Sequence, residues 1–250
     1  MLWTFEPGVL VGCAALAACY LWACRAASLP RKLAFVAAEA ALLGALISPL
    51  DALADRISFA AHMAQHLLLL EVAAPLLVLA IPFRVPSPRP LLAWLVGFGT
   101  LAFWHIPIFY DAALRADPLH ALEHISFVAS AFVFWWPVLG VQRRLEPLTA
   151  VFYLFARMAA NLALGSLIYA APANFFAVYH GAFGLNVLQD QRLGAILMWA
   201  PTLILDALAA PLLLALATSA KAGARPNPRS PAGIDRGGSR ALRSAGARRG

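Results

Sequence analysis

Long apolar runs, separated by short segments rich in proline, glycine or charge, dominate the pattern of hydrophobic and polar positions along the chain. A helix that crosses the hydrocarbon core of a bilayer needs about 20 predominantly apolar residues. Seven runs come close to this length, near residues 8–24, 33–50, 62–81, 91–108, 120–140, 149–170 and 194–218. The pattern therefore predicts an all-α fold, a polytopic membrane helix bundle with seven transmembrane helices.

The composition excludes a soluble protein. Of the 250 residues, 62% are hydrophobic and only 12% are charged. A soluble domain carries about 25% charged residues, so this chain has about half of the charge that a water-exposed surface of its size requires. The same numbers exclude a disordered chain, because disorder requires low hydrophobicity.

Lysine and arginine residues gather on alternate loops. The loops at 25–32, 82–90 and 141–148, together with the segment 221–250, hold 15 of them. The opposite loops hold three, Arg56, Arg115 and Arg192. Because positively charged loops remain in the cytoplasm, we expect the N-terminus outside and the C-terminus in the cytoplasm of a bacterial cell.

The excess charge lies entirely in the last 30 residues. The formal net charge is +7, and the segment 221–250 alone holds eight basic residues and one acid. A segment so rich in arginine, glycine, alanine and proline cannot bury a core. We therefore divide the chain into a seven-span membrane domain at 1–220 and a disordered basic tail at 221–250. The tail is expected to lie on anionic lipid rather than to bind nucleic acid.

The histidines all fall on the outer side of the predicted membrane domain. Two pairs, His62 with His66 and His120 with His124, share the pattern H-x-x-(Q/E)-H at the start of a span. Residues i and i+4 lie on one face of a helix, about 6 Å apart, so each pair can offer two imidazoles to one metal ion. The competing interpretation is that these histidines bind lipid headgroups or backbone carbonyls.

Other residues near the outer face extend the candidate metal site. Imidazole suits copper, zinc, iron and nickel, whereas thioether sulfur favours Cu(I). Met63 and Met198 are the thioethers that lie near this face. The full set of candidate metal ligands is His62, His66, His120, His124, His105, His180, Met198 and Asp190.

Ionisable residues also occur inside the predicted spans. Three acids, Glu39, Glu71 and Asp206, accompany a single cation, Arg157. A charge at the centre of a membrane helix costs about 2.5–3.5 kcal/mol, so such residues face the bundle interior and pair. We expect Glu71 and Arg157 to form an intramembrane charge pair. On an ideal helix Glu71 points away from His62, which argues against its ligating the same ion.

Three separate motifs resemble the CtaG family of caa-type cytochrome c oxidase assembly factors. They are HMAQHLLL at 62–69 with APLL at 74–77, WHIP at 104–107 with the histidine pair at 120–124 behind it, and DQRLG at 190–194 with MWAP at 198–201. The resemblance covers residues 5–215. It implies a non-enzymatic multi-pass protein of the bacterial cytoplasmic (inner) membrane, with cytochrome c oxidase subunits as partners. It also favours copper over zinc as the metal held or delivered by the histidines.

The sequence also bears on four other protein classes. A metal-free scaffold that binds oxidase subunits remains open, as does a b-type cytochrome with two histidine haem ligands. All the histidines lie at one leaflet, however, which prevents a transmembrane haem ladder. The H-x-x-E-H sequence at 120–124 matches a metalloprotease motif, but the sister motif has Gln65 in place of the catalytic glutamate. A retinal protein is excluded because Lys32 and Lys221 both lie at the cytoplasmic edge.

Overall fold

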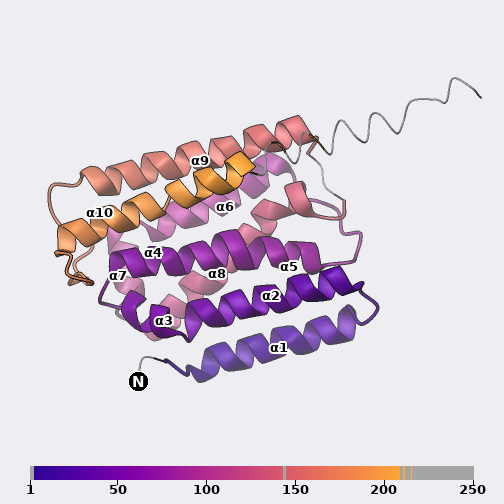
Figure 1. The fold of residues 1–250 in the computed structure, drawn as a ribbon, viewed down its shortest axis with the longest axis horizontal. Helices are drawn as coiled ribbons and strands as arrows, with labels where there is room; N and C mark the ends of the chain where they lie inside the picture. Colours follow the sequence, from indigo (N-terminus) through magenta and orange to yellow (C-terminus); the bar gives the residue numbers. More distant parts are fainter. Residues whose placement is uncertain (1–2, 143–144, 209–210, 212–214, 216–250) are drawn as a thin grey trace, which may run out of the picture.

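The structure is a computed structural model that describes residues 3–142, 145–208, 211 and 215. The regular elements of this part of the chain are helices, as predicted (Figure 1). They are α1 (Pro7–Ala23), α2 (Leu29–Leu46), α3 (Pro49–Ala54), α4 (Phe59–Leu67), the π-helix η1 (Leu68–Ala73), α5 (Ala74–Ala80), α6 (Pro90–Trp104), α7 (Pro107–Ala113), α8 (Asp117–Leu139), α9 (Pro147–Ala170) and α10 (Val187–Leu197). Residues 200–208 are also helical, whereas the predicted tail at 221–250 lies outside the described residues.

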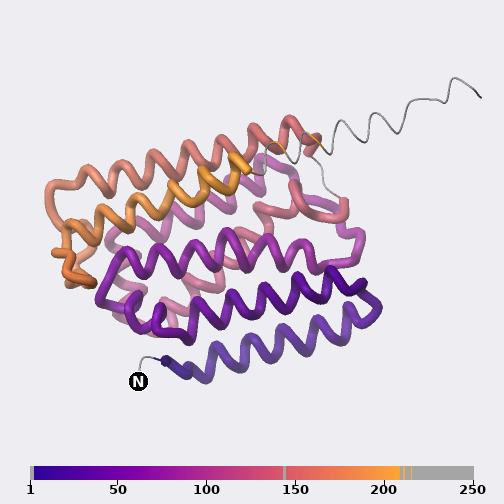
Figure 2. Tube along the Cα trace, in the orientation of Figure 1, coloured from indigo at the N-terminus to yellow at the C-terminus, as the bar shows by residue number. Residues whose placement is uncertain are grey.

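The long helices lie side by side in one bundle (Figures 1 and 2). The continuous path of α4, η1 and α5 runs through its middle. It packs against α2 on one side, α8 behind it and α10 on the other side. Helix α1 packs against α2 at one edge, and α9 packs against α10 at the opposite edge.

Within the part of the chain that the structure describes, three helical segments are long and apolar enough to cross a membrane, namely Phe59–Ala80, Asp117–Leu139 and Pro147–Ala170. The bent pair α6 and α7 makes a fourth candidate. Helix α1 is 17 residues long and buries only Tyr20, so its apolar surface faces outward and suits lipid. These helices support a multi-pass membrane protein, while the count of seven spans and the orientation remain predictions.

The fourth predicted span, at 91–108, is broken near its C-terminal end. Helix α6 ends at Trp104, and α7 leaves it at an angle of 77°. Pro107 causes the break, because proline lacks an N–H group and disfavours the helical conformation in the residue before it. Ile106 is accordingly extended, with φ −70° and ψ 122°. The break leaves His105 at the end of α6, where its ring can point into the bundle.

The third predicted span contains a π-helical segment. Between Leu68 and Ala73 the helix widens, and the N–H of Ala74 donates to the carbonyl of Leu69, five residues earlier. Pro75 follows directly and has no N–H to offer the carbonyl of Glu71. Segments of π-helix inside a longer helix often mark functional positions. Glu71, the charged residue of this segment, belongs to the buried network described below.

Candidate metal centre

Helices α4 and α8 bring the two histidine pairs together. The ring of His62 lies 5.5 Å from that of His120 and 6.1 Å from that of His124, measured between ring centroids. The ring of His66 lies 5.8 Å from that of His124. With Glu123 of α8 these four residues form what we call the histidine cluster.

The cluster lies inside the bundle rather than on its surface. The exposed fractions are 0% for His62, 3% for His66, 8% for His124 and 1% for Glu123. Only His120 is half-buried. The sequence predicts these residues at the outer membrane face, and the structure shows that they are buried against neighbouring helices. His120 is therefore the member of the cluster that lies nearest to the surface, although its Nε2 atom is buried.

The polar atoms of the cluster lack hydrogen-bond partners among the described residues. They are Nε2 of His62, both ring nitrogens of His66, Nε2 of His120, Nε2 of His124 and both carboxylate oxygens of Glu123. Nε2 of His66 lies 3.8 Å from Oε1 of Glu123, beyond hydrogen-bond distance. Buried polar groups are nearly always hydrogen-bonded, so each exception needs an explanation. A bound cation would give a partner to one nitrogen of each imidazole that ligates it, or to the carboxylate of Glu123.

Two overlapping groups within the cluster have the composition of a metal site. One is His62, His66 and His124, and the other is His62, His120 and Glu123. In each group the ligand atoms lie within 4.8 Å of one another. Three nitrogens, or two nitrogens and a carboxylate, suit copper or zinc. The donor set fits a transition metal, and it leaves the identity of the metal open.

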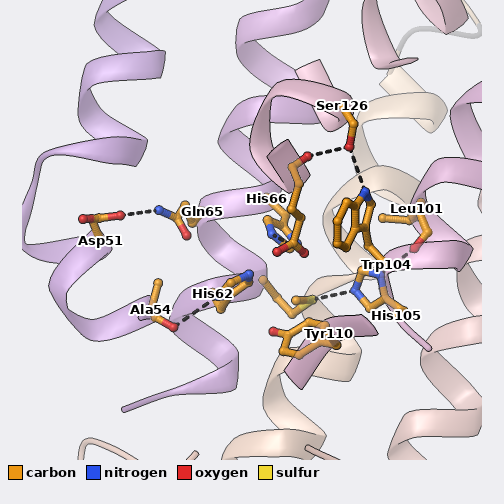
Figure 3. A network of polar contacts seen from close by, with 12 residues as sticks. Asp51, Ala54, His62, Gln65, His66, Leu101, Trp104, His105, Tyr110 and Ser126 are labelled. Atoms are coloured by element: carbon orange, nitrogen blue, oxygen red, sulfur yellow. Dashed lines mark hydrogen bonds and ion pairs between the residues drawn. The ribbon is translucent and has the colours of Figure 1, made fainter. Parts of the chain in front are cut away.

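His62 is oriented by a partner outside the cluster. Its Nδ1 lies 3.1 Å from the carbonyl oxygen of Ala54, in α3 (Figure 3). A carbonyl can only accept, so Nδ1 carries the proton and Nε2 keeps its lone pair. Hydrogen bonds of this kind fix the orientation and tautomer of metal-binding histidines.

The two H-x-x-(Q/E)-H motifs use their central residues differently. Glu123 points into the cluster, whereas Gln65 points away from it and donates to the Ala45 carbonyl at 3.0 Å and to Oδ1 of Asp51 at 2.8 Å (Figure 3). Burial raises the pKa of Asp51, although hydrogen bonds from Thr4 and Gln65 act in the opposite direction. Gln65 thus anchors α4 to α2 and α3 instead of contributing a ligand.

Two tyrosines close one side of the cluster. Tyr110 of α7 and Tyr179 of the loop at 171–186 are both almost fully buried, and their hydroxyl oxygens are 2.5 Å apart. Their rings lie 5.3 and 6.2 Å from the ring of His62. Burial raises the pKa of Tyr179, so its hydroxyl stays protonated. Nothing in the sequence singles out these residues, because neither lies in a motif with the histidines.

His105 and Met198 lie beside the cluster, on its inner side. Nδ1 of His105 is 2.8 Å from the Leu101 carbonyl, and its Nε2 is 3.4 Å from the sulfur of Met63 (Figure 3). Met198 packs in the same hydrophobic group as Met63. Both of these predicted ligands therefore adjoin the cluster without belonging to either three-residue group.

Asp190 and His180 lie apart from the cluster. Asp190 is fully buried, and its two carboxylate oxygens accept hydrogen bonds from the Ser58 hydroxyl at 2.6 Å and the Phe59 N–H at 2.7 Å. It fastens α10 to the start of α4. His180 is exposed, and its backbone N–H donates to the Ile57 carbonyl. The structure brings neither residue into the two ligand groups.

A buried charge network lies deeper in the bundle. Nη1 of Arg157 donates to both carboxylate oxygens of Glu71, at 2.8 and 2.7 Å, and its Nη2 donates to Asp206 at 2.8 Å. The guanidinium also lies over the rings of Phe134 and Trp135. The sequence predicts the Glu71–Arg157 pair, and Asp206 joins it as a second acceptor on the same cation.

These features together define a class of protein: a multi-pass helical membrane protein with a buried histidine cluster suited to a transition metal. The sequence pattern of the cytochrome c oxidase caa3 assembly factor family (Caa3_CtaG) matches residues 15–88 and 87–220. The chain therefore belongs to this family, as the three motifs predict.

The curated relatives are themselves uncharacterized. An uncharacterized protein of Mycobacterium leprae is 25% identical over 181 residues, which cover 58% of this chain and 28% of the relative. Uncharacterized proteins of Mycobacterium bovis and Mycobacterium tuberculosis are each 24% identical over 181 residues, covering 58% of this chain and 27% of each relative. The chain thus spans less than a third of the length of these relatives. No solved structure matches it.

Proposed function

We propose that this protein helps to assemble a haem–copper cytochrome c oxidase by holding copper in its histidine cluster and releasing it to an oxidase subunit. Membership of the assembly-factor family supports the proposal that the protein acts on cytochrome c oxidase. The main support for copper binding is the set of buried histidine nitrogens on α4 and α8 that have no hydrogen-bond partner among the described residues. A protein that only scaffolds oxidase subunits has no need of such a set, which is costly to bury.

The cluster has the features of a site for temporary storage. His62, His66 and His124 hold the ion, and the half-buried His120 gives it a route in and out. Both α4 and α8 direct their N-termini at this region, and each helix dipole opposes a cation by about 0.3–1 kcal/mol. The carboxylate of Glu123 offsets that repulsion. Binding is then strong enough to retain copper and weak enough to allow its transfer.

The location of the site follows from the proposed topology. We infer seven spans with the N-terminus outside, which puts the start of α4 and of α8 at the periplasmic side of the bacterial cytoplasmic membrane. Copper held there is available to an oxidase subunit that receives its metal on the same side. Zinc in place of copper is the alternative for this donor set.

The test is metal analysis of the detergent-purified full chain. The double variant His62→Ala/His124→Ala should lose at least half of the bound copper, because it removes two ligands from one group and one from the other. His180→Ala is the matched control, since His180 is an exposed histidine outside both groups, and it should bind copper as the wild type does. Cells carrying the double variant should assemble an oxidase with less copper and lower activity.

A different result would separate the alternatives. If the double variant reaches normal protein levels and still supports a copper-replete oxidase, the metal-free scaffold is the function. If the purified wild type holds zinc and no copper, the cluster is a zinc site.

A further inference from the structure

A second group of soft donor atoms adjoins the histidine cluster. A cavity of about 50 Å³ lies between α4, α6 and the start of the helical stretch at 200–208. Its lining includes Met63, His66, His105 and Met198. All four of these side chains are more than nine-tenths buried. The cavity therefore gathers two thioethers and two imidazoles away from water.

The contact between His105 and Met63 is not an ordinary hydrogen bond. Nδ1 of His105 lies 2.8 Å from the Leu101 carbonyl oxygen, which can only accept, so the ring proton is on Nδ1. Nε2 then presents a lone pair to the sulfur of Met63 at 3.4 Å, and that sulfur is itself an acceptor. Two acceptors that face each other without a hydrogen between them have the arrangement of two ligands of one cation.

The distance between these atoms suits such an ion. A borderline-soft metal binds imidazole nitrogen at about 2.0 Å and sulfur at about 2.3 Å. Donors 3.4 Å apart can share one ion at those lengths with a bond angle close to tetrahedral. The separation of His105 Nε2 and the Met63 sulfur is therefore compatible with both atoms binding one ion.

His66 connects this group with the histidine cluster. Both of its ring nitrogens lack hydrogen-bond partners among the described residues. Its ring is 6.0 Å from that of His105 and 5.8 Å from that of His124, measured between centroids. The neutral ring has one lone pair at a time, so His66 can bind an ion on one side through one nitrogen and, after the ring proton has moved to that nitrogen, on the other side through the second. Glu71 and Arg157 also line the cavity, and their network with Asp206 has one more carboxylate than guanidinium, so the positive charge of Arg157 is more than balanced there.

We propose that Met63 and His105, with His66 and Met198, form a second metal site that selects Cu(I) and exchanges it with the histidine cluster through His66. Thioether ligands select Cu(I) over zinc and other hard or borderline cations. The ion moves as Cu(I), by exchange of one ligand at a time and with no change of oxidation state. This inference rests on the proposed copper-binding function and adds to it the oxidation state and a path of transfer.

The experiment is an anaerobic Cu(I) titration of the detergent-purified full chain against a chromophoric chelator, followed by X-ray absorption at the copper edge. The wild type should bind two Cu(I) per chain, with a sulfur neighbour at about 2.3 Å. Met63→Leu and Met198→Leu should each reduce the stoichiometry from two to one and remove or weaken the sulfur signal. Met158→Leu makes the same chemical change in α9, outside the cavity lining, and should leave both values unchanged.

Selenomethionine labelling of the unaltered sequence guards against variants that fail to fold. A copper–selenium signal in that protein identifies methionine as the ligand and separates it from the cysteines of α1, Cys13 and Cys19, and from Cys24. The variant His62→Ala/His124→Ala should retain the Cu(I) ion that has the sulfur neighbour.

The outcomes are distinguishable. A wild type that binds a single Cu(I), with nitrogen and oxygen neighbours and no selenium signal after labelling, overturns the second site and leaves the proposed function in place. A wild type that binds no copper overturns both.

Discussion

Single residues decide which polar groups in this bundle can bind a metal and which only hold helices together. Gln65 and Glu123 occupy equivalent places in two related motifs, yet the side chain of Gln65 is held away from the imidazoles because its amide N–H group donates to Ala45 and Asp51. Among the described residues no donor reaches the carboxylate of Glu123, which faces the imidazoles. In the same way the oxygens of Asp190 are satisfied by Ser58 and Phe59. An acid near a histidine in the sequence is therefore a ligand only where no donor reaches it first.

The buried charge network gives a prediction at this scale. Arg157 faces two carboxylates, so Arg157→Gln leaves Glu71 and Asp206 without their shared cation. Loss of one partner of a buried ion pair costs about 3–5 kcal/mol. Glu71→Gln should cost less, because Asp206 still pairs with the guanidinium. The unfolding temperature in detergent should therefore fall further for Arg157→Gln than for Glu71→Gln.

A compensating variant provides the control. Glu71→Gln/Arg157→Gln/Asp206→Asn removes every charge of the network and should recover much of the lost stability, since neutral groups in place of a buried ion triad are often tolerated. If the triple variant is no more stable than Arg157→Gln, the three charges do not depend on one another for stability, and this explanation of the network is wrong.

The positions of individual helices depend on packing between segments that are distant in the sequence, and local sequence patterns do not predict this packing. The i, i+4 spacing predicts that His62 and His66 share one helix face, and likewise His120 and His124. It does not predict that α4 and α8 set those faces against each other, because that contact joins residues more than 50 positions apart. The break before Pro107 follows from a proline in the sequence, whereas the π-helical segment and Tyr179 have no local signal. The histidines of the site can thus be predicted from the sequence. The neighbouring segments that enclose them cannot.

The contact between α10 and α4 gives a prediction at the scale of elements. Gly194 faces Phe59 and Ala60 so closely that an added Cβ would overlap the Phe59 ring. Gly194→Ala should therefore destabilise the protein by about 1–3 kcal/mol, the usual cost of overpacking a core. The measurement is the unfolding temperature in detergent.

Gly99 offers the matched control for this change. It also lies in a helix, α6, but a Cβ there meets nothing within 4 Å. Gly99→Ala should raise stability by up to about 1 kcal/mol, because alanine is the better helix former. Equal effects of the two substitutions would show that α10 does not pack tightly on α4.

The whole molecule places its polar chemistry inside and its apolar surface outside, which is the arrangement required of a protein dissolved in lipid. Large apolar side chains such as Trp22, Leu91 and Leu167 are exposed on the outer helices. Arg157, Asp206 and the histidine cluster are buried. Because lipid cannot satisfy polar groups, this distribution supports the multi-pass assignment independently of the helix lengths.

The orientation of the bundle is the last prediction, and the location of the metal site depends on it. Fifteen lysine and arginine residues lie on the loops and tail assigned to the cytoplasm, against three on the opposite side. A fluorescent protein fused after Ala220 should therefore fluoresce, and alkaline phosphatase fused at the same position should be inactive, because the two reporters work on opposite sides of the membrane. A phosphatase inserted after Ala173, in the loop before α10, should be active. Phosphatase activity after Ala220 would place the histidine cluster on the cytoplasmic side, and copper would then have to reach it from within the cell.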